Sequence, residues 1–425
     1  MVTRGARQQQ GRESEITINH DPARVRAVRG RAIVFLAIVS SALTLRMAVT
    51  SLTPLLGGLQ NELGFSTTMM GVFGMAPVAM FGLAGFVTPL FVHRVGVERL
   101  ALIGTAVTFL GLLGRGFAVG AWDELCWYGL ALAGMGIGNV VTPPLVKRYF
   151  PDRITKVSTW YTLAVQLGAV MPPVIAVQLQ QQHGWRFSLA SWAVVPLLVL
   201  PLLAIVVVRS RGAPERVGSE AASRVPFRAL TGSKLAWGMA VLFGVTSLNS
   251  YAVMTWLPKR LAAVGVPAEQ GALMLAFYSV IGIAGPLVVV PLLARVPNPF
   301  VFVLVGGLCH LVGFAGLLWY PTSGTVLWTV FVGLGPITFA MNLTLIGMLT
   351  RSSEHAAALS GFAQGLGYIV AITGPFLFGV LYALTGGWAA SFGFLAVMTV
   401  VGMAGGWFVC RGGYVEDEIA ARLRG

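Results

Sequence analysis

The stretch AVTSLTP at residues 48–54 returns in the second half of the chain as AVMTWLP at residues 252–258. Three more pairs follow in the same order: LGFSTTMMG (63–71) with VGVPAEQG (264–271), GLAGFVTPLFVHRV (82–95) with GIAGPLVVVPLLARV (282–296), and Pro172 and Trp185 with Pro375 and Trp388. One such match would be noise, but four in one order indicate a duplicated chain. The sequence therefore predicts two halves of similar structure.

The composition of the chain predicts that a lipid bilayer surrounds both halves. Hydrophobic residues make up 56% of the 425 residues and charged residues only 10%, whereas a soluble domain carries about 25% charged residues. Because lipid offers no hydrogen-bond partner to an open backbone, we expect an all-α integral membrane protein. Twelve segments are long and apolar enough to span: 32–57, 67–92, 99–119, 124–146, 155–180, 187–208, 235–258, 269–294, 299–319, 325–349, 357–384 and 388–409.

Basic residues orient the predicted helices. Of the 29 Lys and Arg residues, 24 lie in tails and loops on the side of the N-terminus, and only four lie on the other side. Both termini are therefore expected in the cytoplasm of a multi-pass plasma-membrane protein. The net charge of +14 is scattered along the chain, so no nucleic-acid partner is expected. The predicted divisions are an N-terminal tail (1–31), a six-helix half (32–208), a cytoplasmic linker (209–234), a second six-helix half (235–410) and a C-terminal tail (411–425).

Twelve helices in two pseudo-symmetric halves are typical of major facilitator transporters, whose binding site lies between the halves near the middle of the membrane. The loop between the second and third segments resembles the GxxxDRxGRR motif of that superfamily. Arg94, Gly96 and Arg99 fit the motif, whereas Pro89 and His93 replace its glycine and aspartate. The resemblance implies that His93, Arg94, Gly96 and Arg99 serve the cytoplasmic gate. A turn that only carries positive charges on the cytoplasmic side is the alternative.

Arg46 is the only charged residue between Arg31 and Glu62, near the middle of the first apolar segment. None of the 15 Asp and Glu residues lies in the middle of a segment. Arginine stays ionised, and its burial at the centre of a membrane costs several kcal/mol. We therefore expect Arg46 to face a wet cavity and to bind an anion or the electron-rich end of a substrate. Hydrogen bonds to backbone carbonyls and snorkelling are the alternatives.

Other polar and aromatic residues at depth are candidates for the same cavity. They fall on segments that line the cavity of major facilitators or lie beside it: Asn139, Trp160, Tyr161, Gln166, Asn249, Tyr251, Trp256, Asn342, Gln364 and Tyr368. Each of them contacts either the ligand or a neighbouring helix, since hydrogen bonds between membrane helices use the same residue types. His310 lies in a segment expected outside the cavity and is interpreted as a packed histidine.

Five stretches resemble the cyanate/2-nitroimidazole transporter family of the major facilitator superfamily: LRMAVTSLTPLLGGLQNELGFS (45–66), GNVVTPPLVKRYFPDR (138–153), GWRFSLASWAVVPLL (184–198), YAVMTWLPKRLAAVGV (251–266) and LSGFAQGLGYIVAITGP (359–375). The resemblance implies a twelve-helix transporter of a small anion or a small planar polar compound, with Arg46 matching the family's arginine in the first helix. It also implies that Tyr251, Trp256, Gln364 and Tyr368 line the cavity. The aromatic residues favour a ring-containing substrate over a triatomic anion.

The expected function is transport by alternating access, either secondary active or facilitative. Without a buried carboxylate, a proton or an exchanged anion is the candidate coupled species, and uniport is equally allowed. The protein is expected to work as a monomer in the bilayer, on a small-molecule substrate, without a cofactor or a metal. A multidrug or metabolite exporter is the alternative transporter. A membrane receptor or an intramembrane enzyme is the remote alternative, because no catalytic constellation is visible.

Overall fold

The computed structural model describes residues 22–210, 227–283, 285–293 and 295–424, and every regular element in these ranges is helical. The first part of the chain forms α1 (Pro22–Leu52), η1 (Thr53–Leu55), α2 (Leu56–Leu63), α3 (Thr67–Val95), α4 (Val97–Gly114), η2 (Arg115–Phe117), α5 (Ala121–Tyr149), α6 (Ile154–Ser191) and α7 (Val194–Ser210). The second part forms α8 (Phe227–Leu230), α9 (Lys234–Ala262), α10 (Ala268–Ile281), η3 (Gly285–Val289), α11 (Val290–Leu293), α12 (Phe300–Trp319), α13 (Thr325–Leu334), α14 (Ile337–Met348), α15 (Ser353–Thr385), α16 (Trp388–Val409) and α17 (Val415–Arg424). The predicted N-terminal tail up to residue 21, and residues 211–226 of the predicted linker, lie outside the described ranges.

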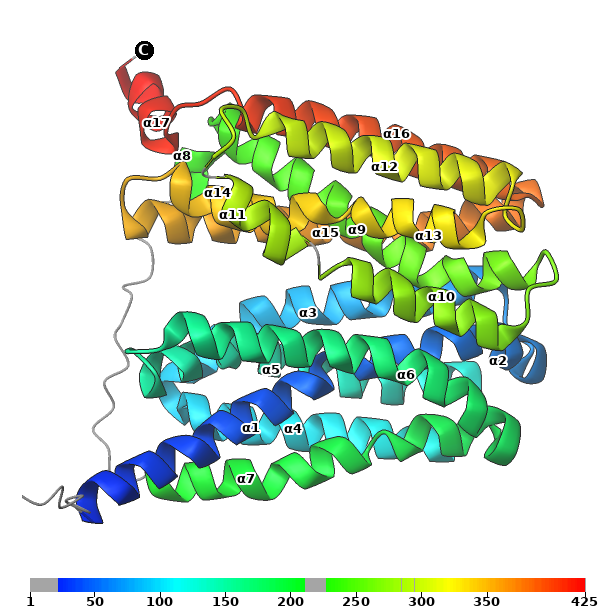
Figure 1. The fold of residues 1–425 in the computed structure, drawn as a ribbon, viewed down its shortest axis with the longest axis horizontal. Helices are drawn as coiled ribbons and strands as arrows, with labels where there is room; N and C mark the ends of the chain where they lie inside the picture. Colours follow the sequence, from blue (N-terminus) through cyan, green and yellow to red (C-terminus); the bar gives the residue numbers. More distant parts are fainter. Residues whose placement is uncertain (1–21, 211–226, 284, 294, 425) are drawn as a thin grey trace, which may run out of the picture.

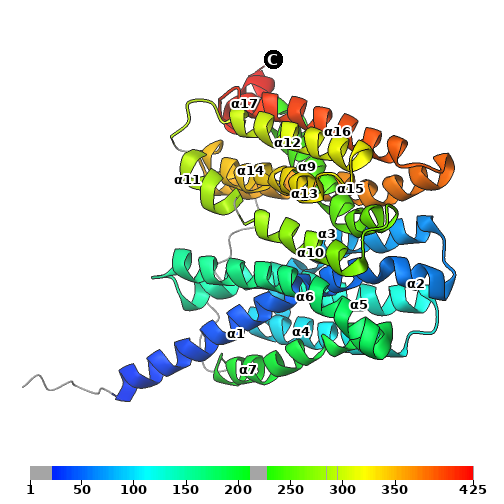
Figure 2. The ribbon, with the colours of Figure 1, turned by 45° about the vertical axis from the view of Figure 1, so that its right-hand side comes forward.

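The helices form two bundles that lie side by side in both views (Figures 1 and 2). Helices α1–α7 make the N-terminal bundle and α9–α16 the C-terminal bundle. The start of α1 and the C-terminal helix α17 lie at the same end of the molecule, on the left in Figure 1. We call this the tail end, and the opposite end, with the loops at 64–66 and 263–267, the distal end.

Matching contacts hold the helices together in the two bundles. Gly114 packs directly against the ring of Trp127 where α4 meets α5, and Gly316 packs in the same way against Trp328 where α12 meets α13. Two further contacts repeat at the same spacing. In the N-terminal bundle Gly104 packs on Gly134 and Gly111 on Ala131, and in the C-terminal bundle Gly306 packs on Gly335 and Gly313 on Val332. Since glycine lets two helix backbones approach closely, the repeated glycines give both bundles the same crossing.

The outer surface of the bundles is apolar. Leu90, Leu198 and Val208 are each more than 60% exposed, and side chains of this kind cover the helices on both bundles. A soluble monomer rarely exposes an apolar surface of this extent, whereas lipid covers it favourably. The chain is therefore a multi-pass membrane protein.

Ten helical stretches in the described ranges are long and apolar enough to span a bilayer. The predicted segments 155–180 and 187–208 fall in one stretch, Lys156–Ser210, which bends at Gly184 with φ +83°. The predicted segment 269–294 is interrupted after α10, because prolines in the GIAGPLVVVPLL stretch lack the N–H that a continuous α-helix uses. The number of twelve spanning helices stays a prediction.

Arg115, near the end of the predicted segment 99–119 and one of the four basic residues counted on the far side of the membrane, lies in the protein interior. Its Nε and Nη2 atoms both lie 2.7 Å from Oε1 of Glu124, and both side chains are fully buried. The guanidinium also stacks over the ring of Tyr128 at 5.0 Å. A buried ion pair of this kind is costly to break, because the remaining charge would have no partner.

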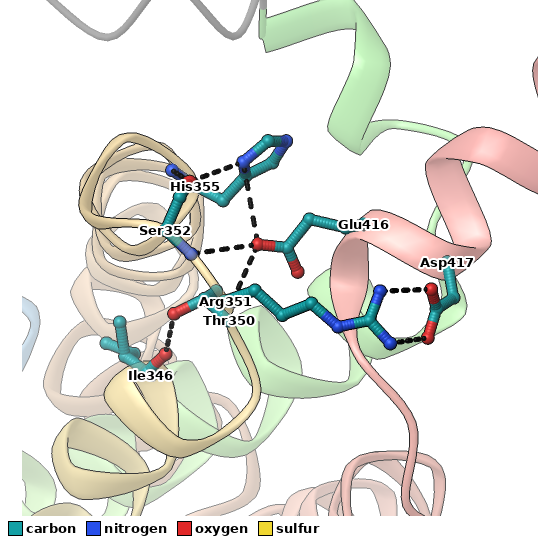
Figure 3. Close-up of polar contacts among 7 residues, drawn as sticks. All are labelled: Ile346, Thr350, Arg351, Ser352, His355, Glu416 and Asp417. Atoms are coloured by element: carbon teal, nitrogen blue, oxygen red, sulfur yellow. Dashed lines mark hydrogen bonds and ion pairs between the residues drawn. The ribbon is translucent and has the colours of Figure 1, made fainter.

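The first turn of α17 binds the tail end of the C-terminal bundle through three carboxylates. Asp417 accepts two hydrogen bonds from the Arg351 guanidinium, at 2.6 and 2.9 Å (Figure 3). These hydrogen bonds raise the pKa of Arg351. Glu416 accepts a hydrogen bond from the backbone N–H of Arg351 at 2.7 Å. Glu418 accepts one from the backbone N–H of Leu235, in the first turn of α9, at 3.1 Å. These contacts attach the C-terminal tail to a single bundle.

Candidate substrate site

Arg46 lies within α1, and its guanidinium has no polar partner among the described residues. The side chain is partly buried, and no hydrogen bond or ion pair joins it to any residue of 22–210, 227–283, 285–293 or 295–424. The guanidinium lies over the face of the Tyr251 ring, with Cζ of Arg46 5.9 Å from the ring centroid. Five N–H donors are thus available to a ligand.

Three tyrosines of the C-terminal bundle lie near this guanidinium. Tyr251 on α9 and Tyr278 on α10 are buried, at 7% and 6% exposure. The Ser250 hydroxyl, which donates to the Thr246 carbonyl at 2.7 Å, lies close to Tyr278, and both Tyr278 and Tyr368 lie within electrostatic reach of Arg46. The arginine of one bundle therefore faces phenol groups of the other.

Close packing of α6 against α1 positions Gln166 at the junction of the two bundles. Gly168 on α6 packs directly against the Leu43 carbonyl of α1, and the Thr50 hydroxyl contacts the Gly168 carbonyl at 3.5 Å. Two residues before this glycine, Gln166 donates a hydrogen bond to the Ser279 carbonyl of α10 at 3.2 Å. The small residue lets α6 lie against α1, and Gln166 then bridges to the C-terminal bundle beside Tyr278.

Three of the predicted site residues make contacts within the C-terminal bundle. The Asn249 amide donates to the Thr399 hydroxyl at 2.9 Å, and the Asn342 amide donates to the Met239 carbonyl at 3.1 Å. The Trp256 indole N–H donates to the Pro375 carbonyl at 3.0 Å. All three side chains are at most 1% exposed. In this conformation they join helices to one another and do not face Arg46.

Four other predicted residues lie in a mixed set of environments. Asn139 is exposed, and Trp160 is 57% exposed. Tyr161 packs with Ala42 and Leu45 of α1 in a small apolar cluster. Gln364 donates to the Ser360 hydroxyl within α15 at 2.7 Å.

Sequence reasoning missed one residue near Arg46, Tyr278. Tyr278 lies in the apolar run LMLAFYSVI, where its hydroxyl was the available signal. A tyrosine hydroxyl at that depth calls for a polar neighbour, and Ser250 of the preceding helix lies close to it.

Residues 34–371 match the Major Facilitator Superfamily, which covers more than half of the chain. The chain belongs to this superfamily. It is a membrane-embedded transporter of small molecules and not an enzyme.

This major facilitator is similar to two transporters of Escherichia coli (strain K12). It is 28% identical to the 2-nitroimidazole transporter over 88% of this chain and 94% of that protein. It is 29% identical to the cyanate transport protein CynX over 86% of this chain and 94% of that protein. The resemblance found in the sequence is thus confirmed. A solved D-xylose-proton symporter shares the fold, with a TM-score of 0.72 at 13% identity, over 91% of this chain and 98% of that chain.

The loop between α3 and α4 of this major facilitator turns at Gly96, whose φ of +87° is disfavoured for residues with a side chain. Arg94 and Arg99 are exposed on either side of it, and the His93 side chain lies outside the described part of the structure. Glu98, which sequence reasoning did not select, is only 4% exposed. It accepts hydrogen bonds from the Tyr149 hydroxyl at 2.8 Å and from Arg148. The loop is thereby bound to the end of α5.

The arrangement around Arg46 suits a ligand that accepts hydrogen bonds. A guanidinium binds carboxylates and other planar anions through two parallel N–H donors, and aromatic rings supply flat apolar walls. Nothing in the described residues resembles a metal centre, since no group of three or more His, Cys, Asp and Glu side chains could hold a metal ion.

Proposed function

We propose that this major facilitator transports a small anion or a small planar polar organic compound, with Arg46 as the substrate anchor. The main support is that the Arg46 guanidinium has no polar partner in the described structure and faces the Tyr251 ring. Leaving such a cation at depth without a partner costs about 2.5–3.5 kcal/mol on insertion scales. A bound anion offsets this cost, and a cationic drug does not. A multidrug exporter of cations is therefore the weaker proposal.

The names of the relatives agree with this class of substrate. One relative carries the name of a nitroimidazole and another that of cyanate, and both compounds present electron-rich atoms to a donor such as Arg46. In this chain, the rings of Tyr251, Tyr278 and Tyr368 provide more apolar wall than a triatomic anion needs. We therefore favour a ring-containing compound with a negative or strongly polar end.

Contacts between the bundles support transport by alternating access. Polar contacts join the bundles at the distal end, from Lys259 to Gln60 and from Gln181 to Glu269. Gln166 donates to the Ser279 carbonyl nearer the middle of the helices. We infer a state that is closed at the distal end. Rocking the bundles about the Arg46 site would open that end and close the other.

The remaining parts of the proposal follow from the charge pattern and the site. The tail end faces the cytoplasm of a plasma-membrane protein, because it carries most of the Lys and Arg residues. Arg46 and the three tyrosines near it belong to one chain, which supports a monomer as the functional unit of the proposal. A proton, an exchanged anion or no coupled species at all accompanies the substrate.

Binding and uptake by Arg46 variants test the proposal. Benzoate, cyanate and 2-nitroimidazole are titrated against purified wild type, Arg46→Gln and Arg46→Lys by thermal shift. Loss of one or two charge-assisted hydrogen bonds, about 3 kcal/mol, raises Kd by roughly 100-fold for the glutamine variant. Arg295→Gln removes an exposed arginine in the loop after α11 and serves as the matched control.

Uptake into proteoliposomes, with and without an imposed pH gradient, then decides whether a proton is coupled. The same vesicles report whether each ligand that binds is also carried. Unchanged affinities in both Arg46 variants, for every probe that the wild type binds, would refute Arg46 as the anchor.

A further inference from the structure

Lys259 is a second cation between the bundles, and it lies near the distal end of α9. Its side chain is partly buried. The ammonium donates a hydrogen bond to Oε1 of Gln60 at 2.7 Å and contacts the Met70 sulfur at 2.9 Å. It also lies over the rings of Trp256 and Tyr382, at 5.6 and 5.8 Å from their centroids.

The partners of Lys259 divide cleanly between the bundles. Gln60 and Met70, which make the polar contacts, belong to the N-terminal bundle. Trp256 and Tyr382, whose rings face the ammonium, belong to the C-terminal bundle together with Lys259. A movement that parts the bundles at this end must therefore break both polar contacts and leave both ring contacts in place.

The two partners on either side are themselves held in position. The Gln60 amide N–H donates to the Thr67 hydroxyl at 3.3 Å, so its oxygen is directed toward Lys259. The Trp256 indole is held by the Pro375 carbonyl and stacks on Phe378 at 5.3 Å. The aromatic frame around the ammonium is thus part of the rigid C-terminal bundle.

No carboxylate among the described residues neutralises Lys259. The nearby distal carboxylates have other partners, since Glu62 accepts a hydrogen bond from the Trp185 indole at 2.8 Å and lies 3.7 Å from Arg186. Glu269 accepts from Gln181 at 2.7 Å. The ammonium therefore carries an uncompensated positive charge at the junction of the bundles.

We propose that Lys259 forms a second anion-binding site, which captures a small monoanion at the distal mouth when the bundles part. The inference rests on the proposed alternating access. In the open state the ammonium loses its glutamine and sulfur partners and keeps only neutral rings. A monovalent anion then supplies the missing partner. Lys259 follows Tyr251 by two helical turns, about 12 Å along α9, so a captured anion has a short path to Arg46.

Charge-selective labelling of a reporter cysteine tests this site. Cys126, Cys309 and Cys410 are replaced by serine, and Ala263→Cys, one turn beyond Lys259, becomes the reporter. Proteoliposomes are exposed to an anionic and a cationic thiosulfonate reagent, and the ratio of the two reaction rates is measured. Benzoate is then added as the competing monoanion.

Four substitutions separate an anion site from a simple latch. Lys259→Gln should lower the ratio of anionic to cationic labelling about tenfold, since a local charge of this kind concentrates counter-ions. It should also abolish protection by benzoate. Lys259→Arg, and Arg186→Gln as the control for a distal charge outside the junction, should leave the ratio unchanged. Gln60→Leu frees the Lys259 ammonium and should maintain or raise the ratio of anionic to cationic labelling.

Two results would overturn the proposal. One is a labelling ratio that Lys259→Gln does not change. The other is a Gln60→Leu variant that lowers the ratio as much as Lys259→Gln, which would make the lysine a latch alone. The ratio does not depend on Arg46, so failure of the central anchor in the binding assay would leave this result standing.

Discussion

Gly74 on α3 controls how closely the bundles approach at the distal end. A Cβ atom added at this position would lie 2.5 Å from the Thr255 hydroxyl oxygen and 2.8 Å from Cβ of Pro375. Both distances are well inside van der Waals contact, and both neighbours belong to the other bundle. Overpacking of this kind costs about 1–3 kcal/mol. Because the contact exists only while the distal end is closed, Gly74→Ala should shift the ratio of closed to open molecules by about 5- to 150-fold.

Distances between spin labels across the distal end measure this shift. Labels at Asn61 on α2 and Ala263 after α9 report on the two bundles, and Gly74→Ala should increase the population at long separation. Gly85→Ala is the matched control, because it lies on the same helix with nothing within 4 Å of the added carbon. It gives the same gain in helix propensity without the overlap. A folded Gly74→Ala protein with the wild-type distance distribution would refute the reasoning.

Three further predictions concern stability and local order. Arg115→Met should cost about 3–5 kcal/mol of unfolding free energy, whereas Arg115→Met combined with Glu124→Leu should be neutral or stabilising, as measured by unfolding in detergent. Glu98→Ala leaves Arg148 without its carboxylate partner and should lower the unfolding free energy by about 1–3 kcal/mol. Faster hydrogen exchange of the backbone amides at the end of α5 would show this loss. Glu418→Ala removes an acceptor at the start of α9 and should lower the unfolding free energy by about 1 kcal/mol. The amide protons of α17 should then exchange faster with solvent. Exchange at the wild-type rate would argue against the contact between Glu418 and Leu235.

The fold class was predicted from the apolar segments and from four repeated sequence pairs, and the structure adds packing contacts that repeat in the same way. Gly114 with Trp127, and Gly316 with Trp328, form the same glycine-to-ring contact at the same place in each bundle. Such contacts depend on spacing along the chain, which the sequence displays. The ends of the helices were harder to predict. At Gly184 the backbone leaves the helical conformation, with φ +83° and ψ 164°, so two helices meet there inside one apolar stretch, and hydropathy alone does not fix the residue at which one ends and the next begins.

The candidate site was predicted less completely, because polarity does not reveal which neighbour a side chain faces. Asn249 and Ser250 are adjacent on α9, yet the Asn249 amide donates to Thr399 inside the bundle, whereas Ser250 lies close to Tyr278, which is near Arg46. Successive residues on a helix point about 100° apart, and only the packed structure fixes which of the two faces the other bundle. Arg46 could be singled out because its charge is costly everywhere except in a wet cavity.

The two cations between the bundles depart from the repeat that governs the rest of the fold. The alignment of AVTSLTP with AVMTWLP places Ser250 opposite Arg46 and Leu55 opposite Lys259, so each cation occurs in one bundle only. A residue needed for packing in both bundles would occur twice, as the glycines of α4 and α12 do. The duplicated positions therefore account for the scaffold. In the proposed mechanism the unpaired Arg46 and Lys259 mark one path for an anion. Tyr251, which Arg46 faces, and Gln60, which accepts from Lys259, each belong to the bundle opposite the cation.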